Sequence, residues 1–329
     1  MNEEDIVKAP KELRVVRNRL NDVFFKTFFS NKSFLISLLN SIFENYPSGN
    51  RIVVTDVEFQ NGELTASQEG GKSCRLDLLV KNEQGIWINV EVQVVPFNMA
   101  QRSLFYFSKV YERQLKESDK YELLKPCVMI SILNFNLKAK TKNFLTRYQL
   151  VELREHEVLN EDLDIFFLEI PKWKKAQSLE EVPTKIKNRL FRWLNYLTGN
   201  DPKLEEQIRN EDHLFREAHD MEGKFLDNDN LWSQYLQQEM ALHDEASKLD
   251  YAKNEGREEG IAEGIAKGIA EGMAKGMAKG KAEGKAEGKL EERFNIVRNL
   301  LANGSSTDFI KQCVNISDEE IKNIQMGKV

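Results

Sequence analysis

Two acidic residues, Asp77 and Glu91, lie in short segments whose polar and apolar residues alternate as they do in β-strands. Glu91 belongs to residues 85–95 (GIWINVEVQVV), where Gln93 falls on the same predicted strand face as Glu91. Asp77 belongs to residues 73–80 (SCRLDLLV), where the predicted opposite face is made of Cys74, Leu76, Leu78 and Val80. The short turn between the segments predicts antiparallel neighbours, so we expect the two carboxylates to lie close together and face the same way.

A pair of buried carboxylates is a chemical conflict, because like charges repel strongly where water is excluded. A divalent cation removes that conflict, and oxygen ligands favour Mg²⁺ or Mn²⁺ over zinc. A metal held in this way can activate water and neutralise charge on a phosphoryl group. Two alternatives stay open at this point: a carboxylate can pair with Arg75 at the strand end, or the polar face can simply be exposed.

A helix predicted for residues 99–118 adds a second polar group. Four of its side chains fall within about 60° on a helical wheel, namely Arg102, Tyr106, Lys109 and Arg113. They offer three cations and a hydroxyl to a phosphate backbone. The opposite side is predicted to pack on a sheet through Leu104, Phe107, Tyr111 and Leu115. The alternative is a solvated helix face with ordinary surface charges.

The elements that must position these residues follow a recognisable order. A helix is predicted to start at Asn21 or Asp22 and to end near Pro47. The predicted strands are apolar runs bounded by turn residues, at 51–60, 73–80, 85–95, 126–135, 148–153 and 164–170. Three antiparallel strands followed by a helical crossover predict an α/β fold with a mixed sheet and helices on its faces.

Six blocks, in this order and spacing, resemble the recombination-promoting nuclease and transposase family of the PD-(D/E)XK nuclease superfamily. The blocks are NDVFFKTFF (21–29), RLDLLV (75–80), NVEVQV (89–94), QRSLFYFSKVYERQL (101–115), YELLKPCVMISIL (121–133) and FFLEIPKW (166–173). The resemblance covers roughly residues 20–175. It implies a restriction-endonuclease-like α-β-β-β-α-β core and a Mg²⁺-dependent DNA endonuclease.

The resemblance also implies roles for single residues. Asp77 matches the metal-binding Asp of the family, and Glu91 matches the acidic residue of its ExQ variant. The main-chain carbonyl of Val92 is then a further metal ligand. Gln93 stands where the superfamily usually has Lys, and a neutral amide cannot supply an ammonium charge, although it can orient water or a phosphate oxygen.

The missing positive charge has three candidate sources. Lys26 lies in the NDVFFK block, and Arg102 and Lys109 lie on the predicted helix. The chain carries a net charge of -6, yet residues 1–150 have 21 Lys and Arg against 17 Asp and Glu. This mildly basic part is where a polyanion such as DNA fits best.

The rest of the chain is predicted to be helical. Residues 176–250 are acidic and are expected to form a bundle packed on the core, or else an acidic partner surface or a mask over the basic site. Nine glycines at four-residue spacing mark residues 251–289, where they oppose a helix by roughly 7–9 kcal/mol relative to Ala. We predict a partner-dependent helical spacer there. Residues 290–329 are predicted to form a small helical cap or dimerisation element, so a homo-oligomer is expected through this half.

Composition excludes several other classes of protein. Three scattered cysteines and four histidines indicate neither a disulfide framework nor a zinc site, and a His-based triad is disfavoured. No apolar run is long enough for a membrane helix, and the charged residues 1–13 do not resemble a signal peptide. We therefore expect a cytoplasmic protein.

These patterns predict four parts: a PD-(D/E)XK nuclease-like domain at 1–175, an acidic helical region at 176–250, the glycine-repeat segment at 251–289 and the small element at 290–329. Two functions remain in competition. The first is a Mg²⁺-dependent DNA endonuclease acting in recombination, mobile-element or genome-defence biology. The second is a non-catalytic, oligomeric DNA- or protein-binding module that retains the nuclease fold.

Overall fold

The computed structural model describes residues 10–46, 52–64, 73–137, 140–177, 188–199 and 201–327. The chain divides into two compact units, residues 1–248 and residues 249–329. Each unit is described by itself. The four-part division predicted from composition stays a prediction.

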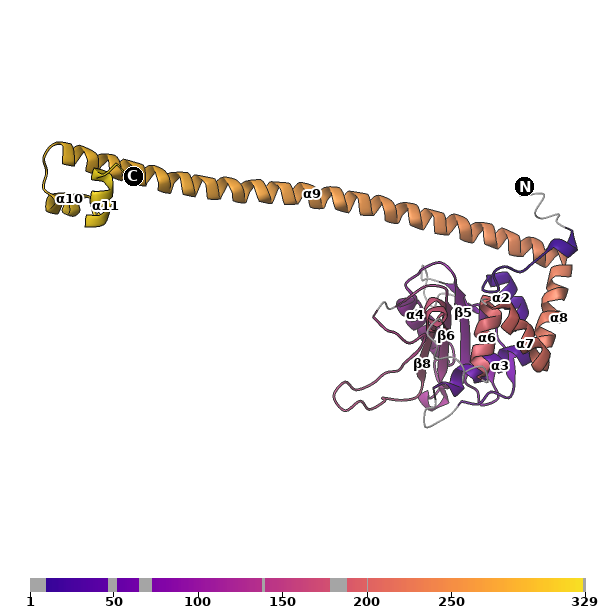
Figure 1. Ribbon diagram of the computed structural model, residues 1–329. Coiled ribbons are helices and arrows are strands. Elements are labelled where there is room, and N and C mark those ends of the chain that lie inside the picture. The colour runs from indigo at the N-terminus through magenta and orange to yellow at the C-terminus, as the bar shows by residue number, and fades with distance from the viewer. Residues whose placement is uncertain are drawn as a thin grey trace. The chain divides into compact units, whose positions relative to one another are not determined.

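A six-stranded mixed sheet lies at the centre of the larger unit (Figure 1). Its strands, in chain order, are β1 (Val57–Phe59), β4 (Leu78–Asn82), β5 (Trp87–Gln93), β6 (Cys127–Leu133), β7 (Leu145–Tyr148) and β8 (Leu163–Glu169). In space the order is β1-β4-β5-β6-β8-β7. Strands β5, β6 and β8 run parallel, whereas β1, β4 and β7 join by antiparallel pairing. The predicted α/β fold with a mixed sheet is confirmed.

Helices cover both faces of this sheet. One face packs against the apolar sides of α2 (Asp22–Phe29), α3 (Lys32–Glu44) and α6 (Arg189–Thr198), through alternating strand residues such as Val80, Ile88 and Val90. The other face packs against α4 (Met99–Glu112) through Leu79 and Met129. Side chains of β5 alternate between the two faces of the sheet, and both faces are covered. Because Ile88 and Val90 take the first face, the polar residues of β5 face α4.

Three predicted strands differ from the observed ones. In the segment predicted at 51–60, only Val57–Phe59 form a strand, β1. The segment 73–80 is not one strand: Cys74 and Arg75 form β3, which pairs with β2 (Glu63–Leu64) in a separate ladder, and the chain bends at Asp77 before β4 begins. The strand predicted at 148–153 lies earlier, as β7, because Leu145 and not the later residues is buried against the core.

The helices that follow the sheet share its core. They are α5 (Ile170–Gln177), α6, α7 (Pro202–Glu211), α8 (His213–Asp227) and the first part of α9 (Asp229–Ala302). Large side chains from α6, α8 and α9, such as Trp193, Phe215 and Trp232, belong to the same apolar cluster as the Phe side chains of α2. This packing agrees with the bundle alternative for the described residues of the acidic region.

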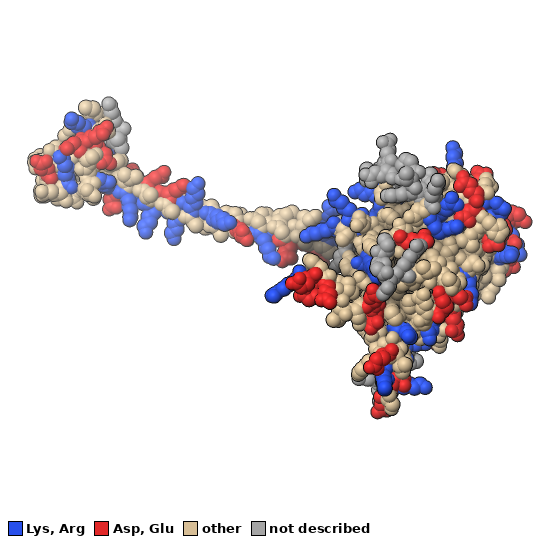
Figure 2. Space-filling view, turned by 90° about the horizontal axis from the view of Figure 1, so that it is seen from below, with Lys and Arg blue, Asp and Glu red and all other residues tan. Residues whose placement is uncertain are grey.

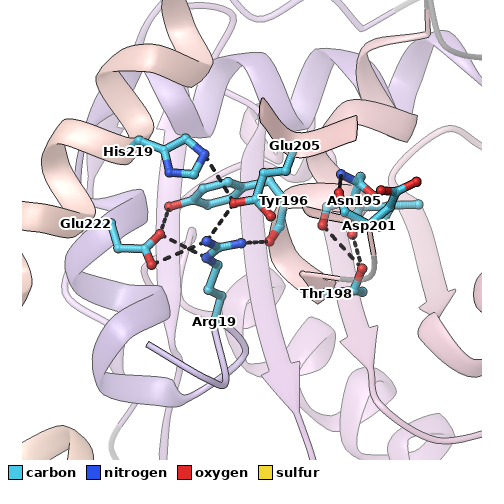
Figure 3. Close-up of polar contacts among 9 residues, drawn as sticks. Arg19, Asn195, Tyr196, Thr198, Asp201, Glu205, His219 and Glu222 are labelled. Carbon is cyan, nitrogen blue, oxygen red and sulfur yellow. Dashed lines mark hydrogen bonds and ion pairs between the residues drawn. The ribbon is translucent and has the colours of Figure 1, made fainter. Parts of the chain in front are cut away.

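A buried ionic cluster ties the residues before α2 to these helices (Figure 3). The Arg19 guanidinium reaches the carboxylates of Glu205 at 2.7 Å and Glu222 at 2.9 Å, and it donates to the carbonyl of Tyr196 at 2.5 Å. The Tyr196 hydroxyl donates to Glu222, and His219 lies 3.2 Å from Glu205. We call these five residues the Arg19 cluster. One guanidinium thus contacts two carboxylates, and hydrogen bonds from His219 and Arg19 stabilise the charged form of Glu205.

The smaller unit contains the rest of α9, α10 (Thr307–Val314) and α11 (Asp318–Gln325). The glycine-repeat residues are helical, and five Ile and Met side chains between residues 261 and 277 are 52% to 77% exposed. The end of α9 packs with α10 and α11 around Val297, Ile310 and Ile321. Ser317 caps the last helix, in a capping box with Glu320.

Candidate active site

The bend at Asp77 places its side chain over the neighbouring strand. The register pairs Leu78 with Val90, so Asp77 comes beside Glu91. Two hydrogen bonds connect these residues: the Val92 amide donates to Asp77 Oδ2 at 3.1 Å, and the Asp77 amide donates to Glu91 Oε1 at 3.0 Å. The two carboxylates are therefore adjacent. In a continuous strand through residues 73–80, the direction of the Asp77 side chain would have been set by strand alternation alone.

Glu91 is the more deeply buried of the two acids, at 2% exposed. It receives a second hydrogen bond, from Asn89 Nδ2 at 3.2 Å, and its strand neighbour on β6 is Ser131. The Asn89 Oδ1 atom is buried without a hydrogen-bond partner among the described residues. Burial, and then the charge of Asp77, raises the pKa of Glu91 to about 8.

Helix α2 brings a cation to the pair. Lys26 Nζ lies 3.0 Å from Asp77 Oδ1 and 2.8 Å from Asp22 Oδ1. Burial raises the pKa of Asp77, and the charge of Lys26 offsets only part of that effect. Burial alone would lower the pKa of Lys26, but the charge and hydrogen bonds of the two aspartates outweigh it and raise the pKa. Lys26 therefore stays an ammonium ion.

Asp22 is a member of the site that the sequence reasoning treated only as a possible helix cap. The cap is Asn21, whose side chain accepts from the amides of Val23 and Phe24. Asp22 is the first residue of α2 and lies one helical turn before Lys26. Their i,i+4 spacing is the sequence signal that could have found it.

Helix α4 brings a second cation from the other side. Arg102 Nη2 lies 3.5 Å from Glu91 Oε2, and Arg102 Nη1 donates to Gln93 Oε1 at 3.3 Å. Arg102 Nε also donates to the Tyr106 hydroxyl at 2.6 Å. Burial, and then the charge of Glu91, raises the pKa of Tyr106 to about 12. The carboxylate pair thus lies between an ammonium and a guanidinium.

One of three comparisons with known proteins identifies a family for the chain. A family model described as a PD-(D/E)XK nuclease family transposase matches residues 19–252. The chain belongs to this family. The matched range begins at Arg19 and includes the sheet, the carboxylate pair and the helices of the larger unit. No curated protein and no solved structure matches the chain in the other two comparisons.

Membership in this nuclease superfamily makes the chain a nuclease-type protein, with DNA as the substrate that the family implies. The predicted resemblance is confirmed and extends further along the chain than residue 175. Among the described helices, none has the length and apolar character that crossing a bilayer requires.

The predicted faces of α4 are only partly right, because Phe107 and Tyr111 pack against the sheet as predicted but other residues do not follow the prediction. Its buried residues are Met99, Ser103, Tyr106 and Val110, whereas Leu104 is 48% exposed. The Ser103 hydroxyl lies 3.4 Å from the Ser131 hydroxyl of β6, so two small side chains meet where helix and sheet approach each other. Tyr106 consequently packs on the sheet instead of facing outward with the cations.

The predicted site residues therefore separate into two groups. The structure brings Lys26, Asp77, Glu91, Val92, Gln93, Arg102 and Tyr106 together. Lys109 instead lies 3.8 Å from Glu112. Arg113 donates to the carbonyl of Asn61 and lies over the ring of Trp87, at 5.1 Å from its centroid. Of the three cations predicted on one face of α4, Arg102 therefore lies at the site, whereas Lys109 and Arg113 contact other residues.

The donor set fits a hard divalent cation. Among the described residues, no group of three or more His, Cys, Asp and Glu side chains is arranged to hold a metal. Mg²⁺ rarely needs such a cage, because one or two carboxylates with water and substrate phosphate complete its coordination. Asp77 and Glu91 are adjacent carboxylates whose pKa values are both raised, mainly by burial, and the charges of Lys26 and Arg102 offset only part of that effect.

Proposed function

We propose that this chain is a Mg²⁺-dependent DNA endonuclease that hydrolyses phosphodiester bonds, with Mn²⁺ able to replace Mg²⁺. The observation that carries this proposal is the carboxylate pair of half-buried Asp77 and buried Glu91, which two backbone-to-side-chain hydrogen bonds hold next to each other. Membership in a nuclease family supports the same reaction class.

Three groups would hold the ion in this proposal: the carboxylates of Asp77 and Glu91 and the main-chain carbonyl of Val92. When bound, the ion supplies a water-derived nucleophile and neutralises charge on the phosphoryl group. Gln93 orients the attacking water or a phosphate oxygen through its amide, which Arg102 already positions by a hydrogen bond.

Lys26 supplies the charge that Gln93 lacks. Its pKa is raised, so it remains a cation, and its side chain is 31% exposed, so it can bind a non-bridging phosphate oxygen. Arg102 and Tyr106 flank the pair on the opposite side. We assign Lys109 and Arg113 to contacts with the DNA backbone beyond the scissile phosphate, where cations bind without reading sequence.

The test is nicking of supercoiled plasmid by purified protein with and without Mg²⁺. Asp77→Asn and Glu91→Gln keep the side-chain shape and are expected to reduce the rate by at least about 100-fold, since each removes a charged ligand. Glu58→Gln, an exposed acid on β1, is the matched control and should cleave normally. Equal cleavage by all four proteins would show a contaminating nuclease and overturn the proposal.

The alternative function has its own outcome in this experiment. If the wild-type protein binds DNA in a gel-shift assay but never cleaves it in Mg²⁺ or Mn²⁺, the chain is a binding module that retains the nuclease fold. We propose a biological role in recombination, mobile-element or genome-defence processes, and the word transposase in the family description supports the mobile-element part of this proposal. We place that role in the cytoplasm.

We also propose that the chain forms a homo-oligomer through its helical half. The support is the ridge of Ile261, Ile265, Ile269, Met273 and Met277, which is largely exposed. Light scattering at increasing concentration should show a mass above 38.1 kDa. Replacing the three isoleucines by Ser should reduce that mass to the monomer, and an unchanged mass would refute this interface.

A further inference from the structure

A cavity of about 460 Å³ adjoins the proposed active site. Its volume falls within the range of about 300–1,000 Å³ that is usual for small-ligand pockets. One arginine connects it to the carboxylate pair: Arg102 lines the cavity and also lies 3.5 Å from Glu91 Oε2. A group bound in the cavity would therefore lie one side chain away from the carboxylates.

The lining of this cavity combines flat rings, cations and amides. Aromatic rings come from Phe97 and Phe105, a second guanidinium comes from Arg75, and carboxamides come from Asn98 and Gln101. Among the described residues that line it, none is acidic. Rings bind the faces of a nucleobase, amides bind its edge, and guanidinium groups bind phosphate.

Phe97 is the most informative of these residues. It lies in the loop between β5 and α4, its side chain is 53% exposed, and the Arg102 guanidinium lies 5.4 Å from its ring centroid. A large ring is thus displayed beside the cavity with one face on a cation. This is the arrangement on which bases stack in proteins that bind single strands.

The larger cavity of the same unit has a different lining. It measures about 610 Å³ and adjoins the Arg19 cluster, and it mixes the cations Arg17, Arg19 and Arg209 with the acids Glu205 and Glu206. Its Arg19 is already bonded to carboxylates, and its described lining has no Phe, Tyr or Trp on which a base could stack. On the face that Figure 2 shows, Lys and Arg side chains are likewise interspersed with Asp and Glu, so neither sign dominates.

We propose that the 460 Å³ cavity binds an unpaired nucleotide of the DNA substrate, with its base stacked on Phe97 and its edge read by Asn98 and Gln101. Arg75 binds the phosphate of that nucleotide. This inference rests on the proposed nuclease function and deepens it, because it names the substrate as DNA with an unpaired base near the cleavage point. Either a single strand or a base extruded from a duplex provides this chemistry.

The experiment measures binding of the full chain, in EDTA, to three fluorescent DNAs: a perfect duplex, the same duplex with one unpaired base, and the single strand. Wild type is expected to bind the two unpaired DNAs at least about 10-fold more tightly than the duplex. Phe97→Ala should remove this preference while leaving duplex binding unchanged. Tyr121→Ala removes another exposed ring, outside the cavity lining, and is the control.

A 2-aminopurine at the unpaired position gives a direct readout of stacking. Its fluorescence should fall on binding to wild type and to Tyr121→Ala but not on binding to Phe97→Ala. Preference for the bulged duplex indicates an extruded base, and preference for the single strand alone indicates a strand end or gap. Equal binding of paired and unpaired DNA by wild type, or unchanged quenching by Phe97→Ala, overturns the proposal.

Failure of this inference and failure of the nuclease proposal are distinguishable. Plasmid cleavage that depends on Asp77 and Glu91, without any preference for unpaired bases, refutes the cavity assignment alone. Preference and quenching without cleavage support the cavity and refute the nuclease activity.

Discussion

Two charge clusters in the larger unit differ in the direction in which their surroundings shift the pKa of a carboxylate. In the Arg19 cluster one guanidinium contacts Glu205 and Glu222, and hydrogen bonds from its neighbours lower the pKa of Glu205 although burial alone would raise it. In the active-site cluster, burial raises the pKa of Asp77, and burial with the charge of Asp77 raises that of Glu91 to about 8.

We interpret the Arg19 cluster as structural and the active-site cluster as a binding site. Charges that satisfy one another hold helices together and need nothing more, whereas carboxylates short of positive charge gain from a further cation. Both clusters were built from ordinary Arg, Lys, Asp and Glu. Their roles follow from the local balance of charge, and four experiments can test that difference.

The largest effect is expected for Arg19→Met. Removing the guanidinium leaves Glu205 and Glu222 as buried charges without their main partner, which costs about 3–5 kcal/mol of unfolding free energy. Urea unfolding followed by tryptophan fluorescence is the measurement, because all four tryptophans lie between residues 87 and 232. Arg17→Met removes an exposed neighbouring arginine and should change stability by less than about 0.5 kcal/mol. Equal effects would mean that the cluster is not structural.

The next effect is stabilisation by metal. Millimolar Mg²⁺ is expected to raise the thermal unfolding midpoint of the wild type by about 2–4 °C, because a cation that binds only the folded state contributes about 1 kcal/mol at a few times its dissociation constant. Glu91→Gln should remove this shift, and Glu58→Gln should keep it. Scanning calorimetry gives the midpoints, and an identical shift in all three proteins would indicate a nonspecific salt effect.

A smaller effect of opposite sign is expected in EDTA. Asp77→Asn should unfold at the same free energy as wild type or up to about 1 kcal/mol higher, because it removes one of two poorly compensated buried charges. Asp164→Asn is the contrast, since Asp164 is paired with Arg147 at 2.7 and 2.8 Å and its loss should destabilise the protein clearly. If both variants lose stability alike, the two kinds of cluster are not different.

The smallest effect concerns acid. The folded-state pKa of Glu205 is below its ordinary value of 4.5, so the unfolded chain binds more protons as the pH falls. The stability that this group contributes is present above about pH 4.5 and is lost as pH drops through the lowered pKa. Glu205→Gln should therefore show a shallower loss of stability between pH 5 and 3 in urea titrations. Parallel curves for the two proteins would contradict the stabilisation of charged Glu205 in the Arg19 cluster.

Several elements could be predicted because their signals are local. The alternation in residues 85–95 predicts β5 and puts Glu91 and Gln93 on one face, and both faces are observed as predicted. The capping box at Ser317 and the start of α7 at Pro202 likewise follow local rules of helix ends. The prediction of one continuous strand through Asp77 was wrong. The chain bends there between β3 and β4, which belong to different sheets, and such a bend depends on the strands with which each segment pairs.

The faces of α4 show a second limit of pattern. Its wheel has cations on one side and apolar residues on the other, yet Tyr106 is buried and Leu104 is exposed. The helix is positioned by the fit of Ser103 against Ser131, a contact between residues 28 positions apart. The pattern of apolar residues along a helix contains no information about such a contact with a distant strand.

Residue types and short spacings were enough to predict the α/β fold and the closeness of Asp77 to Glu91, because the alternation in β5 and the short turn before it are properties of neighbouring residues. Only the folded chain decided that Lys26 and Asp22 come to this pair, that Lys109 and Arg113 do not, and that Arg19 is bound among acids. Those outcomes depend on contacts across as many as 203 residues, and burial in three dimensions sets which charges are matched.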